Sequence, residues 1–256
     1  MTIHEDWLRP DWGQDHVRAF MTTRAGGVSH GACASMNVGL SVGDDPSAVA
    51  HNKSLIEQAL GAPARFVWQV HGAAVLRLRP EHGLPGAERV QADAIVSTMP
   101  GLGLAIQAAD CLPVLFAAPG GVGGAHAGWR GLSAGVLENT VTALCEEAHC
   151  RPEQIHAWMG ACIGPTAFEV GEDVLQAFGA RPSDLDPALF RYQANEQGEA
   201  RWRADLVALA RRRLQAAGLT HISGGHWCTH GDASRFFSFR RSRLDGRMAA
   251  VIRLLG

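Results

Sequence analysis

The chain has 256 residues, of which 46% are hydrophobic and 19% charged, and it carries a formal net charge of −2. Such a chain is too apolar to be disordered, and its length suits one domain spanning residues 1–256. The charge balance gives no reason to expect binding to nucleic acid or to an acidic membrane. No apolar run approaches the roughly 18 residues of a membrane span, and no signal peptide is recognisable, so a cytoplasmic protein is expected. The six cysteines form no CxxC pair, which favours reduced thiols.

The first predicted element is a helix that follows Asp45. This residue is a candidate N-cap, Pro46 occupies the first helical position, and a Gly-Ala-Pro stop stands at 61–63. Short apolar segments come next, each bounded by Gly, Pro or charge, and this pattern predicts strands. They are FVWQV (66–70), AVLRLR (74–79), ADAIVST (92–98), LGLAIQA (102–108), LPVLFAA (112–118) and GVGGAHA (121–127).

The second half of the chain mixes helical and strand patterns. Apolar residues recur at helical spacing over 132–148 and 203–218, which predicts two more helices. The segments 221–228, 235–241 and 247–255 return to strand character, and the polar stretch 182–201 is expected on the surface. Blocks of strands with interspersed helices indicate an α+β protein with a mixed sheet.

Three segments combine a reactive side chain with glycines or a turn. They contain His71 in WQVHG, Asp110 and Cys111 in QAADCLP, and His126 in GGAHAGWRG. Two imidazoles and one thiolate suffice to hold Zn²⁺ and leave a fourth position for water or substrate, as in catalytic zinc sites. Because the spacing matches no local metal motif, the spacing alone favours ordinary strand-end histidines and a buried thiol over a metal site.

A rival cluster lies in HWCTH, where His226, Cys228 and His230 alternate. These residues would share one face of an extended segment. Positions i and i+4 of a strand are roughly 13 Å apart, however, so one ion cannot easily bridge them.

Arginines define a candidate anion pocket. Arg130 lies just before the helix predicted from residue 132, where unpaired N–H groups favour anions. Arg24 in TTRAGGVS and Arg240 or Arg241 in FFSFRRS are candidates for further positive charge. Each is also compatible with a surface arginine over an aromatic ring. The glycines beside Arg130 indicate either close approach of the backbone to a ligand or a tight turn.

Taken together, nine ordered segments resemble the YfiH family of purine nucleoside phosphorylases, formerly labelled laccase-like polyphenol oxidases. They are TTRAGGVS, NVGLSVGDDP, WQVHG, ADAIVST, AADCLPVLF, GGAHAGWRG, GACIGP, HWCT and FFSFRR. The resemblance spans nearly the whole chain and implies layered mixed sheets flanked by helices. It also implies a zinc centre with His71, Cys111 and His126 as ligands.

The implied activities are phosphorolysis of adenosine, inosine and methylthioadenosine, together with hydrolytic deamination of adenosine. Cys111 and His126 are then expected in catalysis, and Asp110 or Asp93 is the candidate acid for the leaving amine. The cosubstrate phosphate is expected at Arg130, helped by other arginines of the candidate anion pocket, Arg24 and Arg240.

Three alternatives remain open at this stage. A copper-dependent polyphenol oxidase is disfavoured because a multicopper centre commonly uses HxH pairs, and the chain has none. In a cysteine hydrolase, His126 would activate Cys111, with a peptidoglycan precursor as one substrate class that the resemblance allows. The third is a metal-stabilised binding protein without turnover. The sequence indicates small-molecule partners and leaves the oligomeric state open.

Overall fold

The computed structural model describes residues 2–83 and 88–256. The helices are α1 (Pro46–Leu60), α2 (Trp129–Ser133), α3 (Val136–Ala148), α4 (Glu172–Ala177) and α5 (Leu206–Ala216). The first helix is capped as its sequence predicts. The Asp45 carboxylate accepts a hydrogen bond from the backbone N–H of Ser47 (2.9 Å), and Gly61 closes the helix at φ 77°. None of the helices in the described ranges is long and apolar enough to cross a bilayer.

The strands form three sheets. They are β1 (Val17–Met21), β2 (Ala64–Phe66), β3 (Val75–Arg77), β4 (Ala94–Ser97), β5 (Gly103–Ala108), β6 (Leu112–Ala118), β7 (Gly121–Ala127), β8 (His156–Met159), β9 (Glu169–Val170), β10 (Phe190–Tyr192), β11 (Trp202–Ala204), β12 (His221–Gly224) and β13 (Met248–Leu254). The six-stranded sheet has the order β12-β8-β6-β7-β4-β3, the four-stranded sheet β1-β13-β5-β2, and a small sheet β10-β11-β9. Both larger sheets contain parallel and antiparallel pairs.

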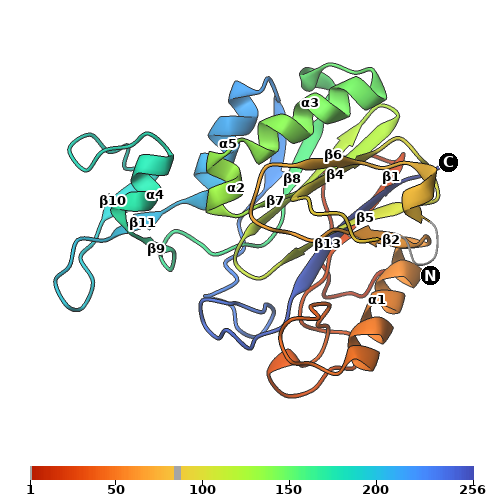
Figure 1. Cartoon of the computed structure of the whole chain (residues 1–256), viewed down its shortest axis with the longest axis horizontal. Coiled ribbons are helices and arrows are strands. Elements are labelled where there is room, and N and C mark those ends of the chain that lie inside the picture. The colour runs from red at the N-terminus through yellow and green to blue at the C-terminus, as the bar shows by residue number, and fades with distance from the viewer. Residues whose placement is uncertain (1, 84–87) are drawn as a thin grey trace.

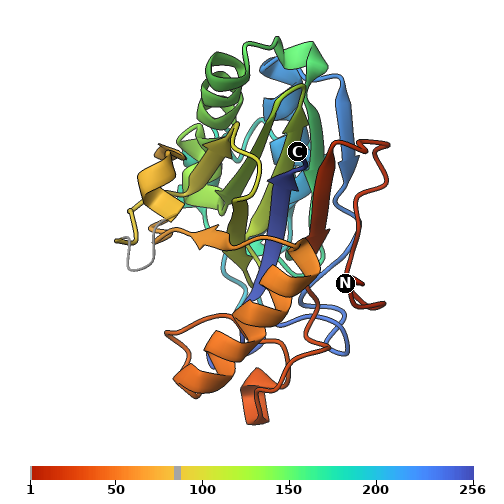
Figure 2. The ribbon, with the colours of Figure 1, turned by 90° about the vertical axis from the view of Figure 1, so that its right-hand side faces the viewer.

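The two larger sheets are stacked face to face between helices, as Figures 1 and 2 show. Side chains such as Leu115 and Ile106 fill the space between the sheets. Phe116 and Leu144 lie in the core between the six-stranded sheet and helices α3 and α5, while α1 covers the outer face of the four-stranded sheet. The fold class, α+β with layered mixed sheets flanked by helices, is confirmed.

Strand β6 shows why the central segments are continuously apolar. All seven of its residues are buried, and alternate side chains enter the helix-facing core or the core between the sheets. A strand buried on both faces has no polar side.

A small lobe projects from the layered body in Figure 1. It consists of β9, β10, β11 and α4, and it includes most of the polar stretch predicted to lie on the surface. The sequence patterns did not predict these short elements, nor β1 and β8.

Four sequence predictions need correction. The predicted strand 66–70 ends at Phe66. Beyond it Trp68 forms only an isolated bridge to Gln91, and from Val70 onward the N–H groups donate to the buried carboxylate of Asp93. The helix predicted over 132–148 is interrupted at Gly135, whose φ of 92° is left-handed. The strand predicted over 221–228 ends at Gly224, where two successive glycines have positive φ.

The segment 235–241 forms no strand. Its backbone N–H groups at Ser238 and Arg240 donate to the carboxylates of Asp245 and Asp110 at 3.0 and 2.6 Å. These side-chain acceptors replace a sheet partner, which is why the segment turns although it is rich in aromatic residues.

Candidate metal centre

Two neighbouring strands bring Cys111 and His126 together. Cys111 directly precedes β6, and His126 lies one residue before the end of β7. The antiparallel register pairs Pro113 with His126 and Leu112 with Ala127, so the start of β6 faces the end of β7. The thiol and the imidazole therefore meet at one edge of the six-stranded sheet.

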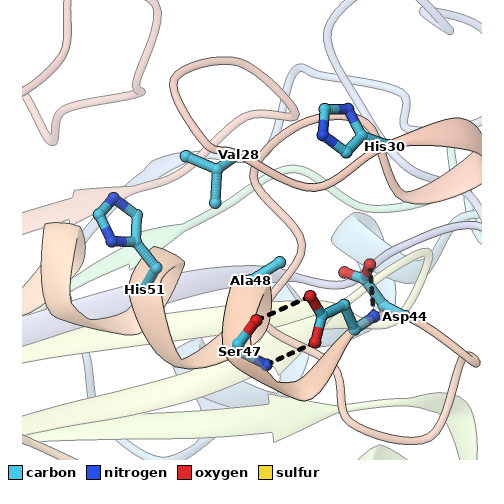
Figure 3. A pocket seen from close by; sticks show the side chains of 7 residues that line it. Val28, His30, Asp44, Ser47, Ala48 and His51 are labelled. Atoms are coloured by element: carbon cyan, nitrogen blue, oxygen red, sulfur yellow. Dashed lines mark hydrogen bonds between the residues drawn. The ribbon is translucent and has the colours of Figure 1, made fainter.

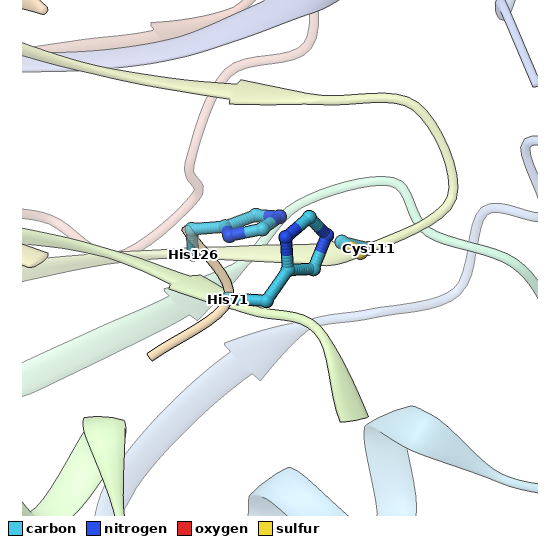
Figure 4. A group of neighbouring side chains, drawn as sticks. All are labelled: His71, Cys111 and His126. Carbon is cyan, nitrogen blue, oxygen red and sulfur yellow. The ribbon is translucent and has the colours of Figure 1, made fainter. Parts of the chain in front are cut away.

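His71 comes to the same point from the loop after β2. Its backbone has φ 63°, an uncommon left-handed conformation for a residue other than glycine. Its ring lies edge-on to that of His126, with ring centres 4.8 Å apart (Figure 4). One ligand atom from each of His71, Cys111 and His126 lies within 4.8 Å of the other two.

Asp93 connects the two histidines. It directly precedes β4, which pairs with β7 so that Ala94 lies opposite Ala125. Asp93 Oδ1 lies 2.9 Å from Nδ1 of His126 and accepts a 2.9 Å hydrogen bond from the N–H of His71. Its Oδ2 accepts bonds from the N–H groups of Val70 and Gly72. The carboxylate thus fixes the His71 loop and directs the His126 Nε2 toward Cys111.

This arrangement changes the acid–base behaviour of the pair. Burial opposes ionisation of the Cys111 thiol, but the charge and hydrogen bonds of His126 and His71 outweigh it and lower the pKa to about 6. Burial likewise opposes protonation of His126, but Cys111 and Asp93 outweigh it and raise the pKa to about 9. A thiolate is the form of cysteine that binds metal ions.

The donor set fits a metal ion. Two imidazoles and one thiolate are typical zinc ligands, and three protein ligands leave one coordination position open. In the described ranges, no other group of three His, Cys, Asp or Glu side chains is arranged to hold an ion. The rival residues His226, Cys228 and His230 do not form such a group.

Two glycines of the GGAHAGWRG segment, Gly128 and Gly131, lie in close contact with neighbouring groups beside the centre. A Cβ atom on Gly128 would lie 2.8 Å from Cys111 Sγ and 3.2 Å from a carbon of the His71 ring. One on Gly131 would lie 2.6 Å from the carbonyl oxygen of Gly72. Neither glycine has a positive φ, so both are required for close approach and not for a left-handed turn.

Asp110 is held in place by three hydrogen bonds. Its Oδ1 accepts from the Thr229 hydroxyl (2.6 Å), and its Oδ2 accepts from the Ser238 hydroxyl (3.0 Å) and the Arg240 N–H. These bonds explain the threonine of HWCT and the serine of FFSFRR. Both candidate acids of the sequence analysis, Asp110 and Asp93, therefore serve in the structure as hydrogen-bond acceptors.

A cavity of about 540 Å³ opens above the centre. Asp110, Cys111, His71 and His126 contribute to its lining, as do Arg130 and Arg240 from the predicted anion pocket. Arg24 does not line it. The Arg24 guanidinium donates to the carbonyl oxygens of Ala34 (3.0 Å) and Ala233 (2.8 Å), which ties two loops together.

Arg130 lies in a different element from the one expected. It belongs to α2, a five-residue helix separate from α3, so the dipole of a long helix does not act beside it. The cavity is also lined by Arg89, Arg247, Trp68 and Phe239, none of which is among the site residues predicted from the sequence. Trp68 and Phe239 lie within the segments WQVHG and FFSFRR, but nothing local shows that their rings line a cavity, because that cavity arises only from packing.

A second, shallower pocket lies at the N-terminal end of α1, and Figure 3 shows it. Val28, His30, Asp44 and His51 contribute to its lining. The two histidine rings point to separate places in this view and do not converge.

Comparison with known proteins places this combination of layered mixed sheets and a His-Cys-His centre. The family model described as a multi-copper polyphenol oxidoreductase laccase matches residues 18–255. A Pseudomonas aeruginosa protein named purine nucleoside phosphorylase is 44% identical over 96% of this chain and 97% of its own length. Escherichia coli YfiH, which carries the same name, is 43% identical over 96% of this chain and 98% of its own.

Solved structures agree with this placement. A Neisseria meningitidis protein has a TM-score of 0.87 and 38% identity, covering 98% of this chain and all (100%) of that one. Geobacillus stearothermophilus YlmD has a TM-score of 0.86 and 32% identity, covering 100% of this chain and 98% of that one. The chain belongs to the YfiH family, the laccase-like family that the sequence resemblance indicated.

Proposed function

We propose that this protein is a zinc-dependent purine nucleoside phosphorylase acting on adenosine, inosine and methylthioadenosine, with zinc held by His71, Cys111 and His126. One observation carries the proposal: the three donors converge in the lining of a cavity to which arginine and aromatic side chains also contribute. The names of the relatives support the reaction class. The soft and borderline donors suit zinc, which when bound supplies a Lewis acid that polarises an oxygen atom of a ligand.

The arginines supply the second requirement of phosphorolysis. In this reaction a phosphate oxygen bonds to C1′, the C1′–N9 bond breaks, and the base leaves. Arg130 and Arg240 offer guanidinium groups that can hold phosphate against C1′ and stabilise its charge. Asp110 takes part by accepting the N–H of Arg240, which fixes the backbone from which that side chain extends.

Adenosine deaminase activity at the same centre is also part of the proposal, although fewer of the observed contacts support it. Asp110 is the carboxylate among the described lining residues of this cavity, and it already accepts three hydrogen bonds. A proton for the leaving amine then has to come from another group. We therefore expect deamination to be slower than phosphorolysis.

The test combines metal analysis with product analysis. Purified protein is expected to hold about one zinc ion per chain, and adenosine is expected to yield adenine when phosphate is present. Cys111→Ala and His126→Ala should abolish both metal binding and turnover. Cys145→Ala is the matched control, because this thiol lies in α3, outside the cavity. Full phosphorolysis by a metal-free variant would sink the proposal.

A cysteine hydrolase is the second candidate, and one observation favours it. His126 lies between the Asp93 carboxylate and the Cys111 thiol, in the order that activates a nucleophilic cysteine. A hydrolase of this kind has no need of His71. If the His71→Ala variant loses the metal but retains hydrolysis, the hydrolase is correct. Peptidoglycan precursors are the first substrates to assay for that hydrolysis.

The same metal analysis distinguishes a copper oxidase from the zinc-dependent phosphorylase. The His-Cys-His donors can also bind copper, and the family model's description names a copper enzyme. A multicopper oxidase needs several copper ions, whereas the described residues provide one three-donor group. Stoichiometric copper together with oxygen consumption on a phenol would favour the oxidase.

A further inference from the structure

Four arginine–aromatic pairs surround the cavity above the metal centre, and all eight residues line it. The distances from the guanidinium carbon to the ring centre are 4.3 Å for Arg130 over Trp129, 5.6 Å for Arg240 over Phe168, 5.4 Å for Arg247 over Phe239 and 5.8 Å for Arg89 over Trp68. A guanidinium that rests on an aromatic ring retains N–H donors for an anion. The cavity thus combines platforms for a planar base with donors for anionic groups.

The positive charge around the cavity exceeds what one phosphate neutralises. The four guanidinium groups carry four positive charges, and Asp110, the carboxylate of the described lining, offsets one of them. Within residues 2–83 and 88–256, none of the four arginines forms an ion pair with a carboxylate. A phosphate group carries at most about two negative charges near neutral pH. Part of the guanidinium charge therefore stays uncompensated when the cosubstrate alone is bound.

The positive charges of Arg89 and Arg247 are partly desolvated, which disfavours the charged form of each guanidinium. Burial and the neighbouring Arg65 lower the pKa of Arg89, and burial lowers the pKa of Arg247. Their aromatic partners are unusually open for such large side chains, since Trp68 is 55% exposed and Phe239 45% exposed. Exposed aromatic residues beside desolvated cations are typical of a ligand-binding surface.

We propose that Arg89 and Arg247 form a second anion subsite, distinct from the phosphate position at Arg130 and Arg240. The cavity accordingly binds purine nucleoside 5′-monophosphates more tightly than the uncharged nucleosides. The purine stacks on the exposed rings, and the 5′-phosphate receives the guanidinium N–H groups. The nucleoside part of this ligand rests on the proposed function, whereas the anion subsite rests on the arginines.

The test is calorimetric titration of the metal-loaded enzyme with adenosine 5′-monophosphate and with adenosine. The nucleotide should bind about ten-fold tighter or more at low salt, because charge-assisted hydrogen bonds add to the nucleoside contacts. Arg89→Gln should reduce this preference toward equal affinities. Arg151→Gln is the matched control, because this side chain is 81% exposed and lies outside the cavity, and it should leave the preference unchanged.

A substitution at Arg247 also requires a stability measurement, because its guanidinium donates to the carbonyl oxygens of Asp245 and Gly246 and so helps to hold the local backbone. Arg247→Gln is interpreted only if its thermal unfolding matches the parent, and Arg89→Gln decides the test otherwise. Equal affinities of nucleotide and nucleoside in the parent enzyme overturn the proposal. So does an Arg89→Gln variant in which only the KM for phosphate rises, since that assigns Arg89 to the cosubstrate.

The outcome separates this inference from the proposed function. If adenosine is cleaved but the nucleotide has no advantage, the second subsite fails alone. If adenosine is neither bound nor cleaved while the nucleotide binds through Arg89, the proposed reaction fails and the anion subsite stands.

Discussion

Asp93 Oδ1 lies 2.9 Å from Nδ1 of His126 and, at the same time, accepts the backbone N–H of His71. One buried carboxylate oxygen thus positions two of the three candidate ligands. This relationship makes Asp93 a positioning residue for the centre, whereas its role as a proton donor stays a prediction.

Asp93→Asn should weaken zinc binding about 10- to 100-fold, as loss of a carboxylate behind a ligating histidine typically does. In the asparagine, the side-chain NH2 group would replace a carboxylate oxygen that now accepts backbone N–H groups, so donor would face donor. Competition with a calibrated chelator measures the affinity. Asp44→Asn, a carboxylate remote from the centre, is the control. Unchanged affinity in Asp93→Asn would show that the other contacts suffice to orient His126.

Gly128→Ala should disrupt the centre without a change in ligands. The new Cβ would lie 2.8 Å from Cys111 Sγ, and such overpacking costs about 1–3 kcal/mol. We expect reduced zinc content and lost turnover. Gly123→Ala is the matched control in β7, because its Cβ would meet Phe116 at an ordinary 3.4 Å. Equal zinc content in the two variants would contradict the steric explanation.

Arg130→Ala should impair phosphate binding, whereas Arg24→Ala should impair stability. Arg130 lines the cavity, so its loss should raise the KM for phosphate about ten-fold or more while the fold stays stable. Arg24 links two loops through backbone carbonyls, so its loss should lower unfolding stability by about 1–3 kcal/mol with little change in KM. Steady-state kinetics and urea unfolding separate the two. A raised KM in stable Arg24→Ala would return this residue to the phosphate site.

Lys53, the single lysine of the sequence, should titrate far below its usual range. Burial, and next the charge of Arg89, lower its pKa from 10.5 to about 8. The folded state therefore loses this proton before the unfolded state does. The charge destabilises the fold fully below pH 8, and the penalty disappears as the pH rises from about 8 to 10.5.

Lys53→Met should accordingly stabilise the protein at pH 7 by about 1 kcal/mol after allowance for solvent screening, with the difference vanishing by about pH 10.5. Urea unfolding of both proteins across this range measures the effect. Reductive methylation with a ¹³C label reports the pKa of this lone side chain directly. A measured pKa near 10.5 would remove the basis for the stability difference.

Local sequence patterns were enough for several elements. Asp45, Pro46 and Gly61 define α1 because capping and helix termination act within a few residues. The runs over 112–118 and 121–127 predict β6 and β7, since strands buried on both faces need continuous apolar sequence. The segment 235–241 defeated the same reasoning, because its backbone partners are side chains distant in sequence, such as Asp110.

The sequence by itself determined the residue types of the site and, through the family resemblance, its three metal-ligand candidates. Only the tertiary structure decided that His71, Cys111 and His126 converge, because strand register and the loop held by Asp93 bring together positions 40 and 15 residues apart. It also separated Arg24 from the cavity and brought Arg89 and Arg247 into it. A local pattern cannot encode such partners, since their meeting depends on how the two sheets and their loops pack.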